Sequence, residues 1–275
     1  MIIKQIHFKL FFLLLLISPA LKADILLLVH GYQGDMYGWH RAGIIPVLER
    51  HGWNGSDVLI ATERGLIPAA ANSDSTDKRI IYLQHNSTIS LVEQSNILAA
   101  ALRFIRDKYP SEKVTIVGYS LGGLMARFTL VRHGASQVKT LISIASPHQG
   151  TRLANRGLDV VDNNFPTSMI KRFFGGSAYG RLERSTQLLR EIVPTFPGGL
   201  LDWLNSRVHP DINYYSIVRT FPNGMLGDLL VPGYSQDMGQ IYPLKEKNTR
   251  IIQGFRHELT INDAYSLLNI LQQEK

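Results

Sequence analysis

The feature that most constrains the fold is a glycine-rich segment around Ser120, which reads Gly-Tyr-Ser-Leu-Gly-Gly from Gly118 to Gly123. An apolar, strand-like run at 113–118 precedes it, and a helix-like run at 121–133 follows it. The pattern is G-x-S-x-G, which between a strand and a helix indicates a sharp turn that exposes a strained serine. Glycines leave room where side chains would collide, and the N-terminus of the helix favours a developing negative charge. We therefore interpret Ser120 as a nucleophile.

Strands and helices are expected to alternate along most of the chain. Short continuous apolar runs, typical of strands buried on both faces of a parallel sheet, are followed by segments with apolar residues at helical spacing. The expected strands are 24–30, 57–61, 79–84, 113–118, 138–145, 213–219 and 250–254, and the expected helices are 43–50, 89–108, 121–133 and 262–273. The polar stretch 62–79 is interpreted as a long loop. The alternation predicts βαβ units and an α/β fold with a mostly parallel central sheet flanked by helices.

The alternation stops between Thr151 and Pro210, where prolines, glycine pairs and apolar clusters follow one another. We interpret about 151–210 as a helical cap or lid inserted into a single domain, 24–275. Its large apolar residues are Phe165, Phe173, Phe174, Phe196 and Trp203. Two interpretations stay open. The insertion is either a lid that forms an acyl pocket and docks on lipid, or an ordinary helical subdomain packed on the core.

The first 23 residues have the layout of a secretory signal peptide. Lys4 and Lys9 provide a positive start, Leu10–Ile17 is an apolar run, and small residues follow. The run is shorter than the roughly 20 residues that a membrane span needs. Cleavage after Ala20 or Ala23 fits, with Ala23 preferred, and an uncleaved N-terminal anchor is the alternative. We expect a secreted or periplasmic protein.

Composition and charge exclude several kinds of chemistry. The chain has no cysteine, so disulfides, thiolate metal sites and a cysteine nucleophile are excluded. Removal of residues 1–23 takes away three lysines and no acidic residue, which lowers the formal net charge from +7 to +4. No dense basic run follows, which argues against a nucleic-acid partner. Weak attraction to anionic lipid headgroups stays open.

The expected general base is His257. In chains with this serine turn, the acid and then the histidine follow the serine. Of the nine histidines, His257 is the one that lies after the insertion and after a plausible acid. His148 and His209 come too early. His30, at the end of the first expected strand, is expected to fix its loop by hydrogen bonding.

The acid is sought among the acidic residues that lie between the insertion and His257. They are Asp211, Asp228, Asp237 and Glu246. Asp228 follows the strand expected at 213–219, whereas Asp211 precedes it and Asp237 lies further out in a polar turn. We favour Asp228, with Asp237 as the alternative. The carboxylate would hold one ring nitrogen of His257, so that the other takes the proton of Ser120.

Two backbone N–H groups are expected to bind the oxyanion that forms during acyl transfer. One belongs to the residue after the nucleophile, which is Leu121. The other comes from the loop after the first strand, where we assign Tyr32 in the segment His30-Gly31-Tyr32.

With these residues the chain resembles an exported bacterial lipase or esterase of the α/β-hydrolase superfamily, and more narrowly the lipase-like families that include the GPI-inositol deacylase type. The matching segments are His30-Gly31-Tyr32, Gly118-Tyr-Ser-Leu-Gly-Gly123, Ser146-Pro147-His148-Gln149-Gly150-Thr151, Gly227-Asp228 through Val231-Pro232, and His257. The resemblance implies that His148 shapes the site and is not a base. It also implies a minimal N-terminus, because the first expected strand begins almost at the cleavage point.

The resemblance implies hydrolysis of carboxylic esters through an acyl-enzyme, with Ser120, Asp228 and His257 as the triad. The expected substrate is a small-molecule or lipid ester, with transient contact to a lipid surface. The chemistry requires no metal and no organic cofactor, and a structural calcium ion is left open. The alternatives are a lipid acyltransferase, thioesterase or amidase on the same fold. A catalytically silent binding protein is a further alternative, although such a protein would usually have lost one of the three residues.

Overall fold

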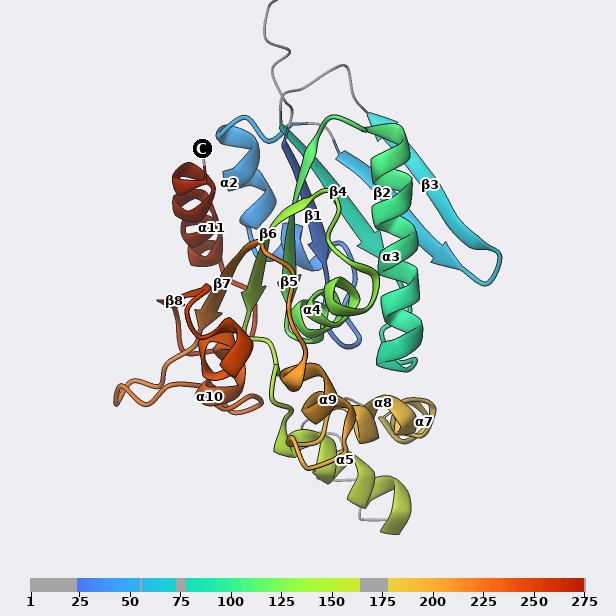
Figure 1. The fold of residues 1–275 in the computed structure, drawn as a ribbon, viewed down its shortest axis with the longest axis vertical. Coiled ribbons are helices and arrows are strands. Elements are labelled where there is room, and N and C mark those ends of the chain that lie inside the picture. The colour runs from blue at the N-terminus through green and yellow to red at the C-terminus, as the bar shows by residue number, and fades with distance from the viewer. Residues whose placement is uncertain (1–23, 55, 73–77, 164–177, 275) are drawn as a thin grey trace, which may run out of the picture.

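A mostly parallel β-sheet forms the centre of the structure (Figure 1). The structure is a computed structural model that describes residues 24–54, 56–72, 78–163 and 178–274. Within these residues the sheet has eight strands in the order β3-β2-β4-β1-β5-β6-β7-β8, and all neighbours run parallel except β2 and β3. The strands are β1 (Asp24–Val29), β2 (Ser56–Thr62), β3 (Gly65–Asn72), β4 (Lys78–Gln84), β5 (Lys113–Tyr119), β6 (Val138–Ile144), β7 (Asn213–Val218) and β8 (Asn248–Ile252).

The register of the central strands brings the segment that contains Tyr32 close to the segment that contains Ser120. β1 and β5 are buried along almost their whole length, as the continuous apolar runs predict. Val29 of β1 pairs with Gly118 of β5, so both strands end at the same edge of the sheet. The loop that carries Tyr32 therefore leaves the sheet beside the turn that carries Ser120.

Helices cover both faces of the sheet (Figure 1). On one face lie α3 (Leu91–Lys108) and α4 (Leu121–His133), which pack on each other, and α4 also packs on the central strands β1, β5 and β6. On the other lie α1 (Gly38–Arg41), α2 (Ile44–Arg50) and α11 (Ile261–Gln273), of which α2 and α11 pack together. Burial of an apolar stripe on each helix is the main stabilising term in such a layered fold.

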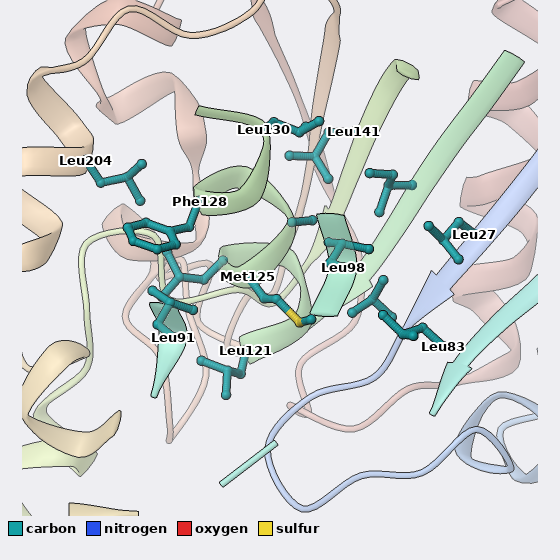
Figure 2. Close-up of a cluster of buried hydrophobic side chains, with 14 of the residues drawn as sticks. Leu27, Leu83, Leu91, Leu98, Leu121, Met125, Phe128, Leu130, Leu141 and Leu204 are labelled. Carbon is teal, nitrogen blue, oxygen red and sulfur yellow. The ribbon is translucent and has the colours of Figure 1, made fainter. Parts of the chain in front are cut away.

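The helix that follows Ser120 is buried on all sides over most of its length. Figure 2 shows Leu121, Met125 and Phe128 of α4 among side chains from the sheet and from α3. Leu204, from a segment far along the chain, lies in the same cluster. α4 is thus held by both the sheet and the helices that follow β6.

The prediction that 62–79 is a loop was wrong for its first part. Residues Gly65–Asn72 form β3, which pairs antiparallel with β2. β3 lies at the edge of the sheet, where it has a single neighbouring strand and stays largely exposed, so no alternation of apolar residues marks it. Pro68 is tolerated there because an edge strand has backbone groups that need no partner strand.

Four described helices lie between β6 and β7, and Figure 1 places them beyond the carboxyl ends of the strands. They are α5 (Arg152–Asn163), α7 (Ala178–Arg184), α8 (Thr186–Glu191) and α9 (Leu200–Ser206). Trp203 packs edge-on against Phe128 of α4, with ring centroids 5.8 Å apart, and lies partly buried against the core. Phe196 is half exposed. Phe165, Phe173 and Phe174 lie outside the described residues, and the role of the insertion as a lid stays a prediction.

The segment between β7 and β8 carries short helices: α10 (Gly233–Gln236), η1 (Met238–Gln240) and η2 (Tyr242–Leu244). The predicted signal peptide, 1–23, lies outside the described residues. Among the helices of the described ranges, none has the length and apolar character required to cross a bilayer.

Candidate active site

Ser120 lies in the turn between β5 and α4 with φ +51° and ψ −124°, a backbone conformation that residues other than glycine rarely adopt. The surrounding glycines are needed because the backbone passes very close to itself. A Cβ at Gly118 would collide with the backbone of Gly123, and one at Gly122 would collide with the carbonyl oxygen of Val29. The motif thus reflects steric exclusion at this strand end.

His257 joins Ser120 to Asp228. Its Nε2 lies 2.9 Å from Ser120 Oγ, and its Nδ1 lies 2.9 Å from Asp228 Oδ2. A neutral imidazole that donates from Nδ1 and accepts the serine hydroxyl at Nε2 satisfies both contacts. The side chain of Asp228 is 1% exposed and that of His257 is 12% exposed. The structure therefore brings together the serine, histidine and aspartate that the sequence singles out.

Asp228 has hydrogen-bond partners in addition to His257. Its Oδ1 accepts from the backbone N–H groups of Leu230 and Val231 at 2.7 and 2.8 Å, and Gln236 Nε2 donates to Oδ2 at 2.9 Å. Burial acts to raise the pKa of Asp228, but the hydrogen bond and charge of His257 and the two backbone donors outweigh it, so the pKa lies below its ordinary value. The acid is thus kept as an oriented carboxylate.

Gln236 and Arg219 connect the loops that carry the acid and the base, and sequence reasoning missed both. Gln236 accepts from the backbone N–H of Arg219 at 2.8 Å while it donates to Asp228. The Arg219 guanidinium donates to the carbonyls of Gln253 and Glu258, on either side of His257, at 2.9 and 3.2 Å. These contacts join residues far apart in sequence, so no local signal could have found them.

A buried ion pair completes this support. Arg219 Nη1 lies 2.6 Å from Asp263 Oδ1, and both side chains are fully buried. Asp263 also accepts from the backbone N–H of Thr260 at 2.8 Å and so caps α11. The loop that carries His257 is therefore anchored at its base by α11 and by the end of β7.

Asp237, the alternative acid, has a different role. Its carboxylate accepts from the backbone N–H of Gly239 at 2.8 Å, from Asn248 Nδ2 at 2.9 Å and from Arg250 at 3.2 Å. Within the described residues it makes no hydrogen bond to His257. Asp211 is exposed and pairs with Lys247, and Glu246 is exposed as well. The geometry places Asp228, of the four candidates, against the histidine.

The backbone N–H groups of Tyr32 and Leu121 have no acceptor within the described residues. Both residues line the pocket that also contains Ser120 and His257. A Cβ at Gly31 would lie 2.8 Å from Ser120 Cβ, so the glycine before Tyr32 lets this loop approach the serine closely. Two unoccupied donors beside a nucleophile are the arrangement that an oxyanion requires.

The loop that carries Tyr32 is fixed from several sides. His30 Nδ1 donates to the carbonyl of Gly31 at 2.9 Å, its Nε2 accepts from the backbone N–H of His85 at 3.4 Å, and the two rings stack with centroids 4.2 Å apart. Burial lowers the pKa of His30 and keeps the ring neutral. Tyr32 Oη lies 2.9 Å from Ser185 Oγ, which links the loop to the residue before α8. His30 thus stabilises the loop and lies apart from the proton path.

His148 is fully buried, and its backbone carbonyl contacts a side chain of α4. Burial, followed by the nearby charges of Arg127 and His209, holds the pKa of its ring well below the ordinary value. Arg127 of α4 donates to the His148 carbonyl at 3.2 Å and to Asn205 Oδ1 of α9 at 2.6 Å. Arg127, another residue that the sequence analysis missed, therefore joins α4 to the segment after β6 and to α9.

A pocket of about 210 Å³ opens above Ser120. Apolar side chains from the loops and from α5 and α8 supply most of its wall, including Leu153, Leu189, Ile192, Leu230 and Val231. Such a wall suits an apolar acyl or alcohol group. Within the described residues, no three His, Asp or Glu side chains gather in a way that could hold a metal ion.

Residues 24–174 match the family model described as the alpha/beta hydrolase fold, and the chain belongs to this family. No curated protein sequence matches the chain.

Solved structures share the fold along nearly the whole chain. The product of the lin2722 gene from Listeria innocua superposes with a TM-score of 0.62 at 17% identity, covering 90% of this chain and 94% of that one. Lipase BlEst2 of Bacillus licheniformis, in its mature form, superposes with a TM-score of 0.58 at 18% identity, covering 92% of each chain. The esterase PF2001 of Pyrococcus furiosus gives 0.52 at 14% identity, covering 92% of this chain and 80% of that one.

Proposed function

We propose that this protein is an exported serine hydrolase that cleaves carboxylic esters, with Ser120 as nucleophile, His257 as general base and Asp228 as the orienting acid. The observation that carries the proposal is the unbroken hydrogen-bonded chain from Ser120 Oγ through His257 to Asp228, at a pocket where two backbone N–H groups have no described acceptor. The names lipase and esterase of two structures with the same fold add support.

The proposed reaction is acyl transfer in two halves. His257 Nε2 takes the proton of Ser120 as Oγ bonds to the ester carbonyl carbon, and the carbonyl oxygen becomes an oxyanion held by the N–H groups of Tyr32 and Leu121. The carbonyl re-forms, the bond to the alcohol oxygen breaks, and His257 gives its proton to that alcohol. Water then repeats the sequence on the acyl-enzyme, which releases the acid and restores Ser120.

A fluorophosphonate probe tests the nucleophile, because it reacts covalently with an activated serine. We expect labelling of the wild type, none of Ser120→Ala, and full labelling of Ser136→Ala, which changes an exposed serine after α4. An unlabelled wild type, or equal labelling of Ser120→Ala, would contradict the proposal. Hydrolysis of matched ester, thioester and amide substrates separates an ester hydrolase from a thioesterase or an amidase, and acyl transfer to an added alcohol in place of water identifies an acyltransferase.

The substrate class and the location are further parts of the proposal. The apolar pocket over Ser120 supports esters with an apolar acyl chain, including lipids at a membrane surface. If hydrolysis rates on a series of p-nitrophenyl esters show no preference for acyl chains longer than butyrate, this part is contradicted.

The apolar run Leu10–Ile17 behind two lysines supports export with cleavage near Ala20 or Ala23. N-terminal sequencing of the exported protein that still finds Met1 contradicts cleavage.

A further inference from the structure

A second pocket, of about 320 Å³, lies on the outer side of the loop that carries Asp228. Two arginines of α5, Arg152 and Arg156, form one part of its wall, and Leu229, Pro232 and Tyr234 form another. Leu153 and Leu230 line both this pocket and the pocket over Ser120. The two spaces therefore adjoin, and one ligand could occupy both.

The two arginines have no protein partner within the part of the chain that the structure describes. They are exposed and four residues apart on α5, so they lie on the same side of the helix about one turn apart. Within the described residues, neither makes an ion pair or a side-chain hydrogen bond. Their guanidinium donors are thus available to an outside acceptor.

The one acidic residue in the wall does not neutralise them. The Asp228 side chain is 1% exposed, and its oxygens already accept from His257, Gln236 and two backbone N–H groups. Positive charge at the rim of a hollow, next to low-dielectric protein, concentrates anions there. Guanidinium groups match the geometry of phosphate and carboxylate oxygens.

The part of the wall that Leu229, Pro232 and Tyr234 form is apolar instead of charged. Leu229 is 85% exposed and Tyr234 is 49% exposed, so both side chains are accessible to a ligand. A ligand that contacts both walls would carry an anionic group beside an apolar chain.

We propose that this pocket, named here the arginine pocket, binds an anionic group of the ester substrate while the ester carbonyl lies at Ser120. The anion is a phosphate or carboxylate, carried by either the alcohol part or the acyl part. This inference rests on the proposed function and narrows it from esters in general to anionic amphiphilic esters.

Matched pairs of soluble esters test the inference and distinguish the two sources of charge. For the alcohol part, 1-hexanoylglycerol is compared with 1-hexanoylglycerol 3-phosphate. For the acyl part, methyl hexanoate is compared with monomethyl adipate. We expect kcat/KM to be about tenfold higher for the charged member of one pair, mainly through a lower KM, and the preference to shrink as salt rises.

The variants are Arg152→Gln, Arg156→Gln and the double variant, with Arg50→Gln as the matched control. Arg50 is an exposed arginine in the last turn of α2, on another part of the molecule. Each single substitution should lower kcat/KM for the charged ester about threefold, and the double variant should abolish the preference, because exposed charge pairs contribute little each. Neutral esters should react equally with all variants, within about twofold. No preference in the wild type, or a preference that survives in the double variant, overturns the inference.

A binding measurement keeps this test separate from the proposed function. Hexyl phosphate, which has no carboxylic ester to cleave, is titrated into the wild type and the double variant. We expect the Kd of the double variant to be about tenfold higher than that of the wild type. Equal Kd values overturn the inference, whereas absence of ester hydrolysis with this Kd difference intact would contradict only the proposed function.

Discussion

The end of the sheet that carries Ser120, His257 and Asp228 differs from the arginine pocket beside it. Asp228 alone accepts four hydrogen bonds, and the loop around His257 is held by Arg219. By contrast, Arg152 and Arg156 have no partner in the described part of the chain. Groups that take part in acyl transfer must be oriented before the reaction to lower its barrier. Groups that only recognise a substrate are free to adjust when it binds. Substitutions at the first region should therefore change kcat, and those at the second should change KM.

The largest expected effect comes from Asp228→Asn. An amide in place of the carboxylate no longer stabilises the charged imidazole and disturbs its tautomer, so kcat for a p-nitrophenyl ester should fall about a thousandfold or more. Asp237→Asn is the matched control, because Asp237 is equally buried and also accepts several hydrogen bonds. It should keep kcat within about twofold and lower the free energy of unfolding by about 1–3 kcal/mol. Similar kcat losses in the two variants would refute the assignment of the acid.

Arg219→Met should have the next largest effect, on stability. The substitution leaves the Asp263 carboxylate fully buried without its cation, which should lower the free energy of unfolding by about 3–5 kcal/mol in urea titrations. Lys247→Met breaks the pair with Asp211, whose side chain is 97% exposed, and should change the same quantity by no more than about 0.5 kcal/mol. A small loss for Arg219→Met would mean that the base of the His257 loop is held by other contacts.

Gln236→Leu should have the smallest effect of the three, and it tests whether the residues that hold Asp228 act on kcat or on KM. The reacting side chains stay, but Asp228 loses the side-chain donor to Oδ2, so kcat should fall about tenfold with KM unchanged. Gln240→Leu is the control, since Gln240 Nε2 makes the equivalent contact to Asp237 at 3.3 Å; it should leave kcat unchanged. A rise in KM with normal kcat for Gln236→Leu would place this residue in recognition instead.

Sequence reasoning correctly predicted the features that a local pattern of residues encodes. The sharp turn around Ser120 has steric requirements that only glycine meets, so a short sequence motif is enough to identify it. Buried parallel strands show as continuous apolar runs, which located the central strands correctly. β3 was missed because an edge strand in contact with one neighbour needs no apolar pattern, and its residues Gly65–Asn72 resemble a loop.

The order of residues along the chain also predicted which side chains would meet. Ser120, Asp228 and His257 follow the ends of β5, β7 and β8, and parallel strands deliver their carboxyl ends to one edge. Asp228 was preferred to Asp237 by placement alone, with no contact to decide between them. The structure puts Asp228 against His257 and turns Asp237 toward Asn248 and Arg250.

Local sequence patterns were enough to predict the type of fold, the position of the strained serine and the residues that accompany it, because these depend on backbone sterics and on the burial of continuous apolar segments. The contacts that hold those residues, and the pocket that lies beside them, became known from the folded arrangement. Gln236, Arg219 and Arg127 act through hydrogen bonds between segments distant in sequence, and the arginine pocket forms where α5 meets the Asp228 loop. Such contacts depend on distances in space, which no local pattern of residues records.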